Sequence, residues 1–246
     1  MDEYKYLSGL IYAKIWNPLL TGMRDMIVKL SKKYDFSNIL DIGCGIGTLC
    51  IMLDKHGFKV TGVDMSETMV KGAIQNSSSK IEYYHEDACN LHFPDQSFDC
   101  IILSYMLHEA DPESRNKIIK EAERLLQKGG KIIIVDFAHP LYSKSLIVKL
   151  FSSLGMFVEL YGGRRHWKNY TDFIKKGALN KIKSDFNLFV IERDNCSLGL
   201  AEIIVAEFPN NKEAKAKPTE DHYYGLFELL SEFREVMGGK CSLGKT

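Results

Sequence analysis

The sequence has no excess of charge of either sign, and this narrows the range of partners. Of its 246 residues, 32 are Lys or Arg and 32 are Asp or Glu, so the formal net charge is zero. Such a chain lacks the general attraction to phosphate polymers that nucleic-acid-binding proteins use. We therefore expect no nucleic acid partner.

Long apolar runs and a basic leader are also missing. The longest apolar stretch, residues 145–160, is interrupted by Lys149, Gly155 and Glu159, so it is too short and too polar to cross a bilayer. The chain begins Met-Asp-Glu, unlike the basic start of a secretory signal peptide. We therefore expect a cytoplasmic protein without a transmembrane segment.

Paired metal-binding cysteines are a third absence. The six cysteines form no C-x-x-C motif and have no histidine at a partnered spacing. Four of them fall in predicted core elements, where cysteine behaves as a small hydrophobic residue. The pattern predicts a reduced protein, and we assign no metal ligand from it.

The apolar pattern predicts an α/β protein. Short β-branched runs alternate with helical patterns, which is typical of a parallel doubly wound sheet. Two later apolar runs, joined by residues 194–197, predict an antiparallel hairpin at the sheet edge. We therefore expect a Rossmann-like sheet of five parallel strands plus this hairpin, seven strands in all, with helical lid insertions. The predicted strands are Asn38–Ile42, Phe58–Asp64, Ile81–His85, Phe98–Ser104, Lys131–Phe137, Asn187–Arg193 and Gly199–Phe208, and the predicted helices are Thr48–Lys55, Ser66–Asn76, Glu113–Leu126 and Thr171–Lys176.

The same pattern predicts three parts along the chain. Residues 1–36 form a helical cap and residues 37–208 a core, in which 138–186 is a helical insertion that covers the acceptor. Residues 209–246 form a polar linker and an amphipathic helix, which we expect to dock on the same domain. Both a monomer and a homodimer are compatible with this pattern.

A glycine loop, Gly43-Cys44-Gly45-Ile46-Gly47, follows the first predicted strand. Alternating glycines let a ligand lie against the backbone, but the spacing differs from the dinucleotide fingerprint G-x-G-x-x-G. Asp41, at the end of the strand, would repel a pyrophosphate and would favour the ammonium and sulfonium groups of S-adenosylmethionine (SAM). The loop therefore favours SAM over NAD. A G-x-x-x-x-G-K-[ST] phosphate loop does not occur in the sequence.

Two further acids follow the next two predicted strands. Asp64 occupies the position from which a carboxylate binds ribose hydroxyls, a role that suits NAD and SAM equally. Asp87 could accept a hydrogen bond from the adenine amino group. Both acids fit a nucleoside ligand.

The combination of motifs resembles the class I SAM-dependent methyltransferases. Within that superfamily the chain is most similar to the enzymes of ubiquinone and menaquinone biosynthesis and to related small-molecule methyltransferases. The narrower resemblance is carried by residues 12–20, by Leu107-His108-Glu109 and by Asp136-Phe137. The broader one is carried, in family order, by Ile39–Gly47, Val60–Ser66, Glu86–Ala88, Ser97–Asp99 and Leu125–Gly130.

The resemblance implies a role for each matching residue. The methionine part of SAM would lie on Asp41 and the glycine loop, and its ribose on Asp64. Ser104 would face the amino acid end, and Tyr12, from the helix before the core, would cover the cofactor. The implied cofactor-binding set is Tyr12, Asp41, Gly43, Cys44, Gly45, Gly47, Asp64, Met65, Glu86, Asp87, Ala88 and Ser104.

The acceptor should lie at the carboxyl ends of the fourth and fifth strands. His108, Glu109 and His139 emerge there and are candidate catalytic groups, since a histidine can act as a base near neutral pH. A base is needed only where the acceptor atom carries a proton. The alternative is that His108 and Glu109 only support the turn that follows.

The segment from Tyr161 to Tyr170 combines two glycines, three basic residues and several aromatic residues. It could close over a substrate as a hinged loop, with His166 and Tyr170 as contacts and Tyr105 opposite. Its basic residues leave contact with an acidic acceptor or with a lipid surface open. The alternative is an exposed loop with a solvated basic face.

These observations predict a SAM-dependent methyltransferase that acts on a small quinone-, lipid- or metabolite-like acceptor and releases S-adenosylhomocysteine. The Ser104-Tyr105-Met106-Leu107 sequence is unlike the Asn/Asp-Pro-Pro-aromatic loop of enzymes that methylate base amino groups. Two alternatives stay open, a SAM-binding regulatory module without catalysis and an NAD-linked oxidoreductase.

Overall fold

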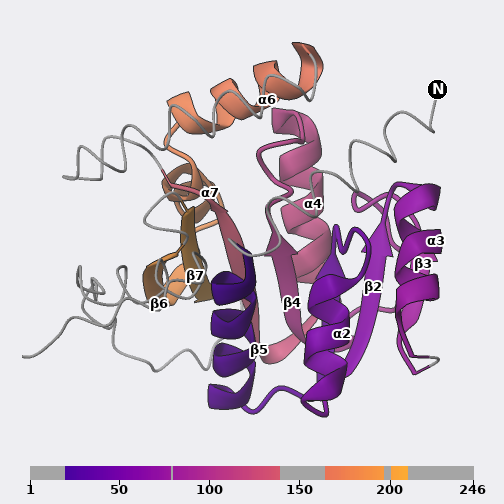
Figure 1. Cartoon of the computed structure of the whole chain (residues 1–246). Helices are drawn as coiled ribbons and strands as arrows, with labels where there is room; N and C mark the ends of the chain where they lie inside the picture. Colours follow the sequence, from indigo (N-terminus) through magenta and orange to yellow (C-terminus); the bar gives the residue numbers. More distant parts are fainter. Residues whose placement is uncertain (1–19, 79, 139–163, 197–200, 210–246) are drawn as a thin grey trace, which may run out of the picture.

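The computed structural model describes residues 20–78, 80–138, 164–196 and 201–209 (Figure 1). The chain forms one open sheet whose strands follow the order β3-β2-β1-β4-β5-β7-β6. The strands are β1 (Asn38–Ile42), β2 (Lys59–Asp64), β3 (Glu82–His85), β4 (Phe98–Ser104), β5 (Leu126–Phe137), β6 (Phe189–Cys196) and β7 (Ala201–Glu207). The helices are residues 20–33, α2 (Thr48–Lys55), α3 (Glu67–Asn76), α4 (Pro112–Leu125), α6 (Arg164–Lys175) and α7 (Leu179–Asp185).

The strand pairing confirms the predicted fold class. Strands β3, β2, β1, β4 and β5 pair in parallel, whereas β7 pairs antiparallel with both β5 and β6. From β1 the chain proceeds to β2 and β3 on one side and then returns to β4 on the other. Open α/β sheets bind their ligands at such a reversal, which here lies at the carboxyl ends of β1 and β4.

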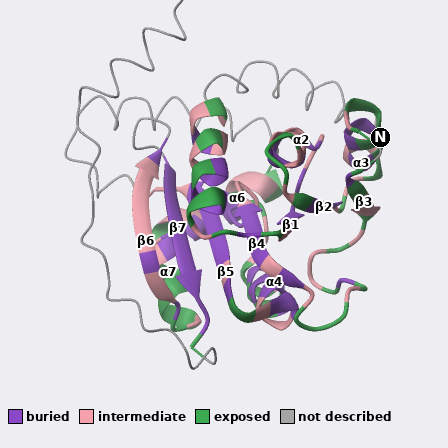
Figure 2. Cartoon of the chain, turned by 90° about the horizontal axis from the view of Figure 1, so that it is seen from below, coloured by how far each residue is buried: buried purple, intermediate pink, exposed green. Residues whose placement is uncertain are grey.

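Both faces of the sheet are covered, and Figure 2 shows the central strands as buried. Side chains alternate along each strand, so neighbours such as Ile39 and Leu40 enter different apolar clusters. Helices α4 and α7, with Phe173 of α6, cover one face, and α2 and the helix of residues 20–33 cover the other. Because strands covered on both faces cannot shift register without exposing apolar side chains, the carboxyl edge is a fixed platform.

Local signals begin two of these helices where the sequence predicts. Ser66 accepts a hydrogen bond from the Met69 amide at the start of α3. Asp111 accepts hydrogen bonds from the Glu113 and Ser114 amides at 3.1 and 3.0 Å, and Pro112 is the first residue of α4. Such caps satisfy amide groups that have no partner within the helix.

Two consecutive glycines, Gly129-Gly130, predict the end of the helix before them, and this prediction is wrong. Helix α4 ends at Leu125 and β5 begins at Leu126, so the two glycines lie within a strand and do not terminate the helix. The register between β4 and β5 shifts at this point, and a Cβ atom at Gly130 would lie 2.9 Å from the Asp99 carbonyl oxygen. The glycine therefore permits close approach of two strand backbones.

Other boundaries differ from the prediction in the second half of the chain. Residues 164–170, predicted as part of a hinged loop, form the first part of α6, and α7 was not predicted. Strand β6 continues to Cys196, through most of the predicted turn. The predicted amphipathic helix and most of the predicted cap lie outside the described residues. Among the described residues, no helix is both long enough and apolar enough to cross a membrane.

Candidate functional site

The glycine loop lies at the carboxyl end of β1 and leads into α2. Gly43, Gly45 and Gly47 all have positive φ angles of 78°, 55° and 75°. The amides of Gly43 and Cys44 both donate to the Val63 carbonyl oxygen of β2, at 2.7 and 3.0 Å. These bonds fix the loop against the neighbouring strand.

The N-terminus of α2 has no side-chain cap, and Tyr83 packs closely against Gly47, the residue before the helix. Gly47 precedes the helix and provides no side-chain cap, which leaves the first amides of α2 for a ligand. A Cβ atom at Gly47 would lie only 2.4 Å from the hydroxyl oxygen of Tyr83, which comes from β3. Glycine is therefore required here by both backbone angle and space.

Asp64 holds the glycine loop from the end of β2. Its Oδ2 atom accepts from the Gly45 amide at 2.9 Å and its Oδ1 atom from the Ser66 amide at 2.8 Å. Burial raises the pKa of this carboxyl, although the two backbone hydrogen bonds oppose the shift. A carboxylate oxygen can accept more than one hydrogen bond, so ribose hydroxyls can still bind Asp64.

Asp41 is not at the surface of the site, as the sequence implied, but inside the domain. It is 2% exposed, and its Oδ2 atom accepts from the Cys50 thiol at 3.3 Å. Its Oδ1 atom is buried and has no hydrogen-bond partner among the described residues. An unpaired buried carboxylate oxygen under a glycine loop fits a ligand that brings a positive charge or a donor.

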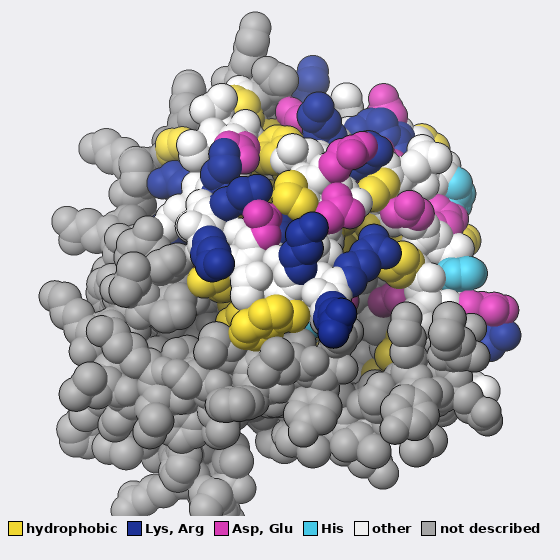
Figure 3. Space-filling view, turned by 90° about the horizontal axis from the view of Figure 1, so that it is seen from above, with side chains coloured by type: hydrophobic (Ala, Val, Ile, Leu, Met, Phe, Trp, Pro, Cys, Tyr) yellow, Lys and Arg dark blue, Asp and Glu magenta, His cyan; other side chains and the backbone are white. Residues whose placement is uncertain are grey.

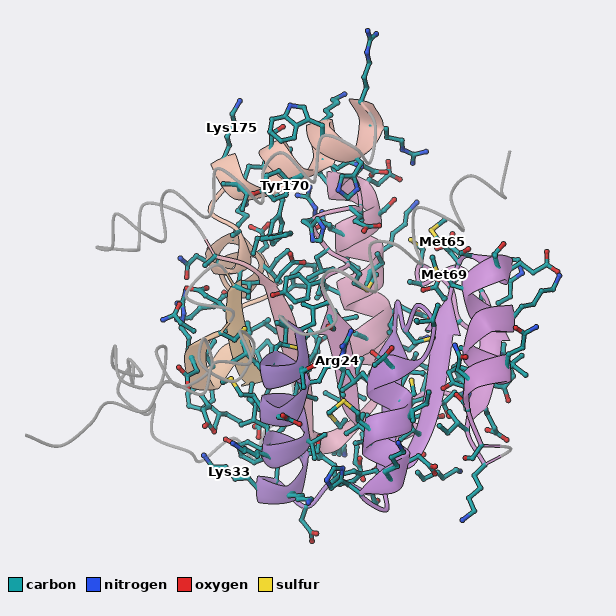
Figure 4. The ribbon with its side chains drawn as sticks, in the orientation of Figure 1. Arg24, Lys33, Met65, Met69, Tyr170 and Lys175 are labelled. Atoms are coloured by element: carbon teal, nitrogen blue, oxygen red, sulfur yellow. The ribbon has the colours of Figure 1, made fainter. Side chains whose placement is uncertain are left out.

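Burial raises the pKa of the Asp41 carboxyl to about 7. The Cys50 hydrogen bond and the charge of Arg24, which comes from the helix of residues 20–33, oppose this shift (Figure 4). Sequence reasoning missed both groups, because neither Cys50 nor Arg24 belongs to a motif. Their proximity to Asp41 results from packing.

The remaining predicted cofactor residues follow β2 and β3. Met65 is 76% exposed and lies beside Met69 on the outer side of the site (Figure 4). Asp87 is exposed and accepts from the Cys89 amide at 2.9 Å. Glu86 is different, because its two oxygens already accept from the amide and contact the ring of His92.

Ala88 and Cys44 contribute to packing. Ala88 is half-buried against the apolar cluster on the α4 face. The Cys44 side chain is buried in the cluster on the α2 face, which leaves only its backbone to the ligand. Tyr12 lies outside the described residues.

The β4–α4 loop, residues 105–111, lies next to the glycine loop. It starts after Ser104, the half-buried end of β4, and the Tyr105 amide donates to the Val135 carbonyl oxygen at 2.8 Å. A Cβ atom at Gly43 would lie 3.1 Å from the Cβ atom of Met106. The two loops therefore border one site at the carboxyl edge.

His108 is fixed by Asp136 at the end of β5. Its Nδ1 atom lies 2.7 Å from Asp136 Oδ1, and the amides of Leu107 and His108 both donate to Asp136 Oδ2. His108 is 2% exposed and Asp136 is fully buried. Because a carboxylate accepts hydrogen bonds, the contact indicates that Nδ1 carries a proton.

Aromatic side chains surround His108. Its ring lies 5.6 Å from the His166 ring and 6.0 Å from the Tyr170 ring, both from α6, and 4.8 Å from the Phe137 ring. The Tyr105 ring contacts Phe137 from the other side at 5.5 Å. Glu109 also lies near His108 and His166, so the structure brings together five predicted acceptor-side residues, whereas His139 lies outside the described residues.

Comparison with known proteins agrees with this geometry. Residues 40–134 match the family described as a methyltransferase domain. Demethylmenaquinone methyltransferase of Staphylococcus haemolyticus is 34% identical over 148 residues, 56% of this chain and 58% of that protein. Ubiquinone biosynthesis O-methyltransferase of Coxiella burnetii is 33% identical over 129 residues, 48% of this chain and 54% of that protein. The chain spans about half the length of the curated relatives that it matches.

Residues 40–134 are therefore similar to a methyltransferase domain. The fold agrees with solved methyltransferases, among them magnesium protoporphyrin IX methyltransferase of Synechocystis PCC 6803. That structure has a TM-score of 0.57 at 20% identity and covers 78% of this chain and 86% of its own. At this identity the likeness concerns the fold alone.

Arg115 connects the β4–α4 loop to α6 and was not predicted. From the start of α4, its buried guanidinium donates to the Leu107 and Ala110 carbonyl oxygens in the β4–α4 loop at 2.8 and 2.9 Å. It also donates to Asp172 Oδ2 and to the Asn169 carbonyl oxygen in α6, at 3.1 and 2.8 Å. One side chain therefore holds α6 over the loop.

The basic residues of α6 lie on the outer face of the described structure. Arg164, Arg165 and Lys168 are exposed, whereas Asn169 and Tyr170 are buried. On the described part of this face, Lys and Arg side chains alternate with Asp and Glu (Figure 3). This helix replaces the hinged loop of the prediction, and its aromatic side still faces His108.

Proposed function

We propose that this chain transfers a methyl group from SAM to a small-molecule acceptor. The observation that carries the proposal is the junction of two loops at the carboxyl edge. The glycine loop, with Asp41 and Asp64, borders the β4–α4 loop, with His108, which supports neighbouring positions for a SAM site and an acceptor site. An in-line transfer needs such adjacency, because the sulfonium is already an activated leaving group.

We assign the cofactor roles from these positions. Asp64 binds the ribose hydroxyls, and the glycine-loop backbone with the open start of α2 binds the methionine carboxylate. Asp41 supplies negative charge to the ammonium end. Adenine lies between Met65 and the Asp87-Ala88 backbone. Glu86 receives no role, because it is paired with His92.

The acceptor side is aromatic and contains one oriented histidine. Phe137, His166 and Tyr170 form aromatic walls around His108, whose ring is oriented by Asp136, and Tyr105 packs on Phe137. Such walls suit a flat or apolar molecule that carries an ionisable group. One relative is named as a demethylmenaquinone methyltransferase and another as an O-methyltransferase of ubiquinone biosynthesis. These names support a quinone-like or lipid-like acceptor.

Calorimetry with SAM, S-adenosylhomocysteine and NAD tests the cofactor. We expect SAM and its product to bind and NAD not to bind. Asp64→Ala should weaken SAM binding by on the order of 2 kcal/mol, as expected for charged hydrogen bonds. Glu82→Ala, an exposed carboxylate at the start of β3, is the control and should bind SAM normally.

Two results would overturn the proposal. Tight binding of NAD would favour an oxidoreductase. Binding of SAM without release of S-adenosylhomocysteine, when a panel of phenols, quinols and lipids is offered, would favour a SAM-binding module without catalysis.

A further inference from the structure

Three potential metal ligands meet above the end of β4. His108 and Glu109 come from the β4–α4 loop and His166 comes from α6, and one ligand atom of each lies within 4.8 Å of the others. The sequence separates His166 from the other two by more than fifty residues, so no ligand spacing is visible in it. The cluster is created by the position of α6.

His108 is oriented as metal-binding histidines are. Its Nδ1 atom is hydrogen-bonded to Asp136 Oδ1 at 2.7 Å, so we assign Nε2 as the atom that would bind a metal ion. Asp136 also accepts from the amides of Leu107, His108 and Phe137, so its buried carboxylate is held by four donors. A carboxylate that orients the second ring nitrogen is the usual support of a metal-bound imidazole.

The other two ligands are held in register by the same network. The Asn169 side chain donates to the Glu109 carbonyl oxygen at 2.7 Å, and Asn169 lies one turn after His166 on α6. Arg115 in turn holds the Asn169 carbonyl oxygen. The backbones that carry Glu109 and His166 are therefore tied to each other directly.

We propose that His108, Glu109 and His166 bind one divalent transition-metal ion of the zinc type. Two imidazoles and one carboxylate suit Zn²⁺, Fe²⁺ or Ni²⁺ better than Mg²⁺ or Ca²⁺, which prefer oxygen ligands only. Three protein ligands leave a fourth position for a water molecule or a substrate. The site is thus of the catalytic, open kind.

The spacing fits this proposal with small movements. Ligand atoms around a tetrahedral zinc ion lie about 3.4 Å apart, which follows from zinc–nitrogen bonds of about 2.1 Å. The exposed Glu109 side chain and the half-buried His166 ring would therefore have to approach by at most about 1.4 Å, while His108 stays fixed on Asp136.

The ion would define the chemical class of the acceptor, an inference that rests on the proposed function. It would bind an acceptor oxygen, as in a phenol, catechol or enediol, and lower the pKa of its hydroxyl group. The hydroxyl proton leaves to solvent and the oxygen electron pair forms the bond to the SAM methyl carbon. The carbon–sulfur bond breaks, and its electrons remain on sulfur as the neutral thioether.

Zinc titration of the full chain tests the site without any acceptor. After treatment with a chelator and removal of any histidine tag, ZnCl₂ is titrated by calorimetry in the absence of SAM. We expect one ion per chain. His166→Ala and Glu109→Gln should each lower the affinity at least tenfold, and Asp136→Asn by about 10- to 100-fold.

The variants are chosen so that loss of fold does not imitate loss of the site. His166 and Glu109 are not fully buried, and circular dichroism checks each variant. His56→Ala, an exposed histidine far from the site in sequence, is the matched control and should bind zinc as the unchanged chain does. Visible absorption of bound Co²⁺ should report nitrogen and oxygen ligands without thiolate.

Absence of zinc binding would overturn the metal site. So would zinc binding by His166→Ala and Glu109→Gln with the same affinity as the unchanged chain. A Co²⁺ spectrum with thiolate bands would also overturn it, because it would assign the ion to cysteines. SAM affinity is measured separately on the same samples. Its loss with zinc binding intact would contradict the proposed function and would leave the metal site standing.

Discussion

At the scale of single residues, Asp41 shows how a motif residue can differ from its expected role. The carboxylate was expected to face a cation directly, yet it is buried with one oxygen bonded to Cys50 and the other without a partner in the described part of the chain. Burial raises its pKa to about 7, so a proton and a cationic ligand compete for the same negative charge.

Asp41 should make the free protein less stable as pH rises. Its folded pKa of about 7 exceeds its ordinary value of 3.8, so the folded state holds a proton that the unfolded chain releases. The free energy of unfolding should fall by up to roughly 1.4 kcal/mol per pH unit between these two values and should level off above them. Asp41→Asn should remove this slope in urea unfolding from pH 4 to pH 8. Parallel curves for the two proteins would contradict the assignment.

At the scale of elements, the contact between the β4–α4 loop and α6 determines the acceptor side. Arg115 supplies four hydrogen bonds across it and lies over the Phe173 ring at 5.1 Å. Asp172 also pairs with Lys176, so it keeps a partner if Arg115 is replaced. The loop carbonyl oxygens that accept from Arg115 would lose that hydrogen bond. Without this side chain, His108 and His166 would lose their common support.

Replacing Arg115 should therefore destabilise the domain. Arg115→Met keeps the apolar stem but leaves buried carbonyl groups unpaired, and we expect a loss of on the order of 3 kcal/mol in urea unfolding. Lys117→Met on the same helix breaks only an exposed pair with Glu113 and should cost less than about 0.5 kcal/mol. Equal effects of the two changes would show that the Arg115 network contributes nothing.

At the scale of the whole molecule, the continuous sheet links the loops to one core. The helix of residues 20–33 and the residue after it are joined to the far edge, since Lys33 and Tyr34 contact Glu192 of β6 at 2.6 and 2.8 Å. The central strands β1, β4 and β5 have fully buried residues on both faces, whereas β3 is short and has no buried residue.

Hydrogen exchange should follow this arrangement. Amides of β1, β4 and β5 should exchange only through global unfolding, while those of β3 should exchange through local opening, at least tenfold faster. Mass spectrometry of peptic fragments measures both in one experiment, and the amides of β6 on the opposite edge provide a comparison. Uniform protection from β3 to β5 would be incompatible with the prediction.

Apolar periodicity and local capping residues in the sequence alone determined the strand order along the chain and two of the helix starts. Apolar runs placed the five parallel strands, because a strand buried on both faces must be apolar throughout. Ser66, Asp111 and Pro112 placed two helix starts, because a cap acts within a few residues. The glycine loop and Asp64 placed the cofactor side, because the turn after β1 needs positive φ angles.

Only the tertiary structure decided which distant residues meet. Asp136 reaches His108 across 28 residues, and α6 brings His166 to the same point. The sequence predicts that the Gly129-Gly130 pair ends a helix, yet the pairing of β4 with β5 places the two glycines inside a strand. These contacts depend on packing between elements, and a pattern of neighbours along the chain carries no record of that packing.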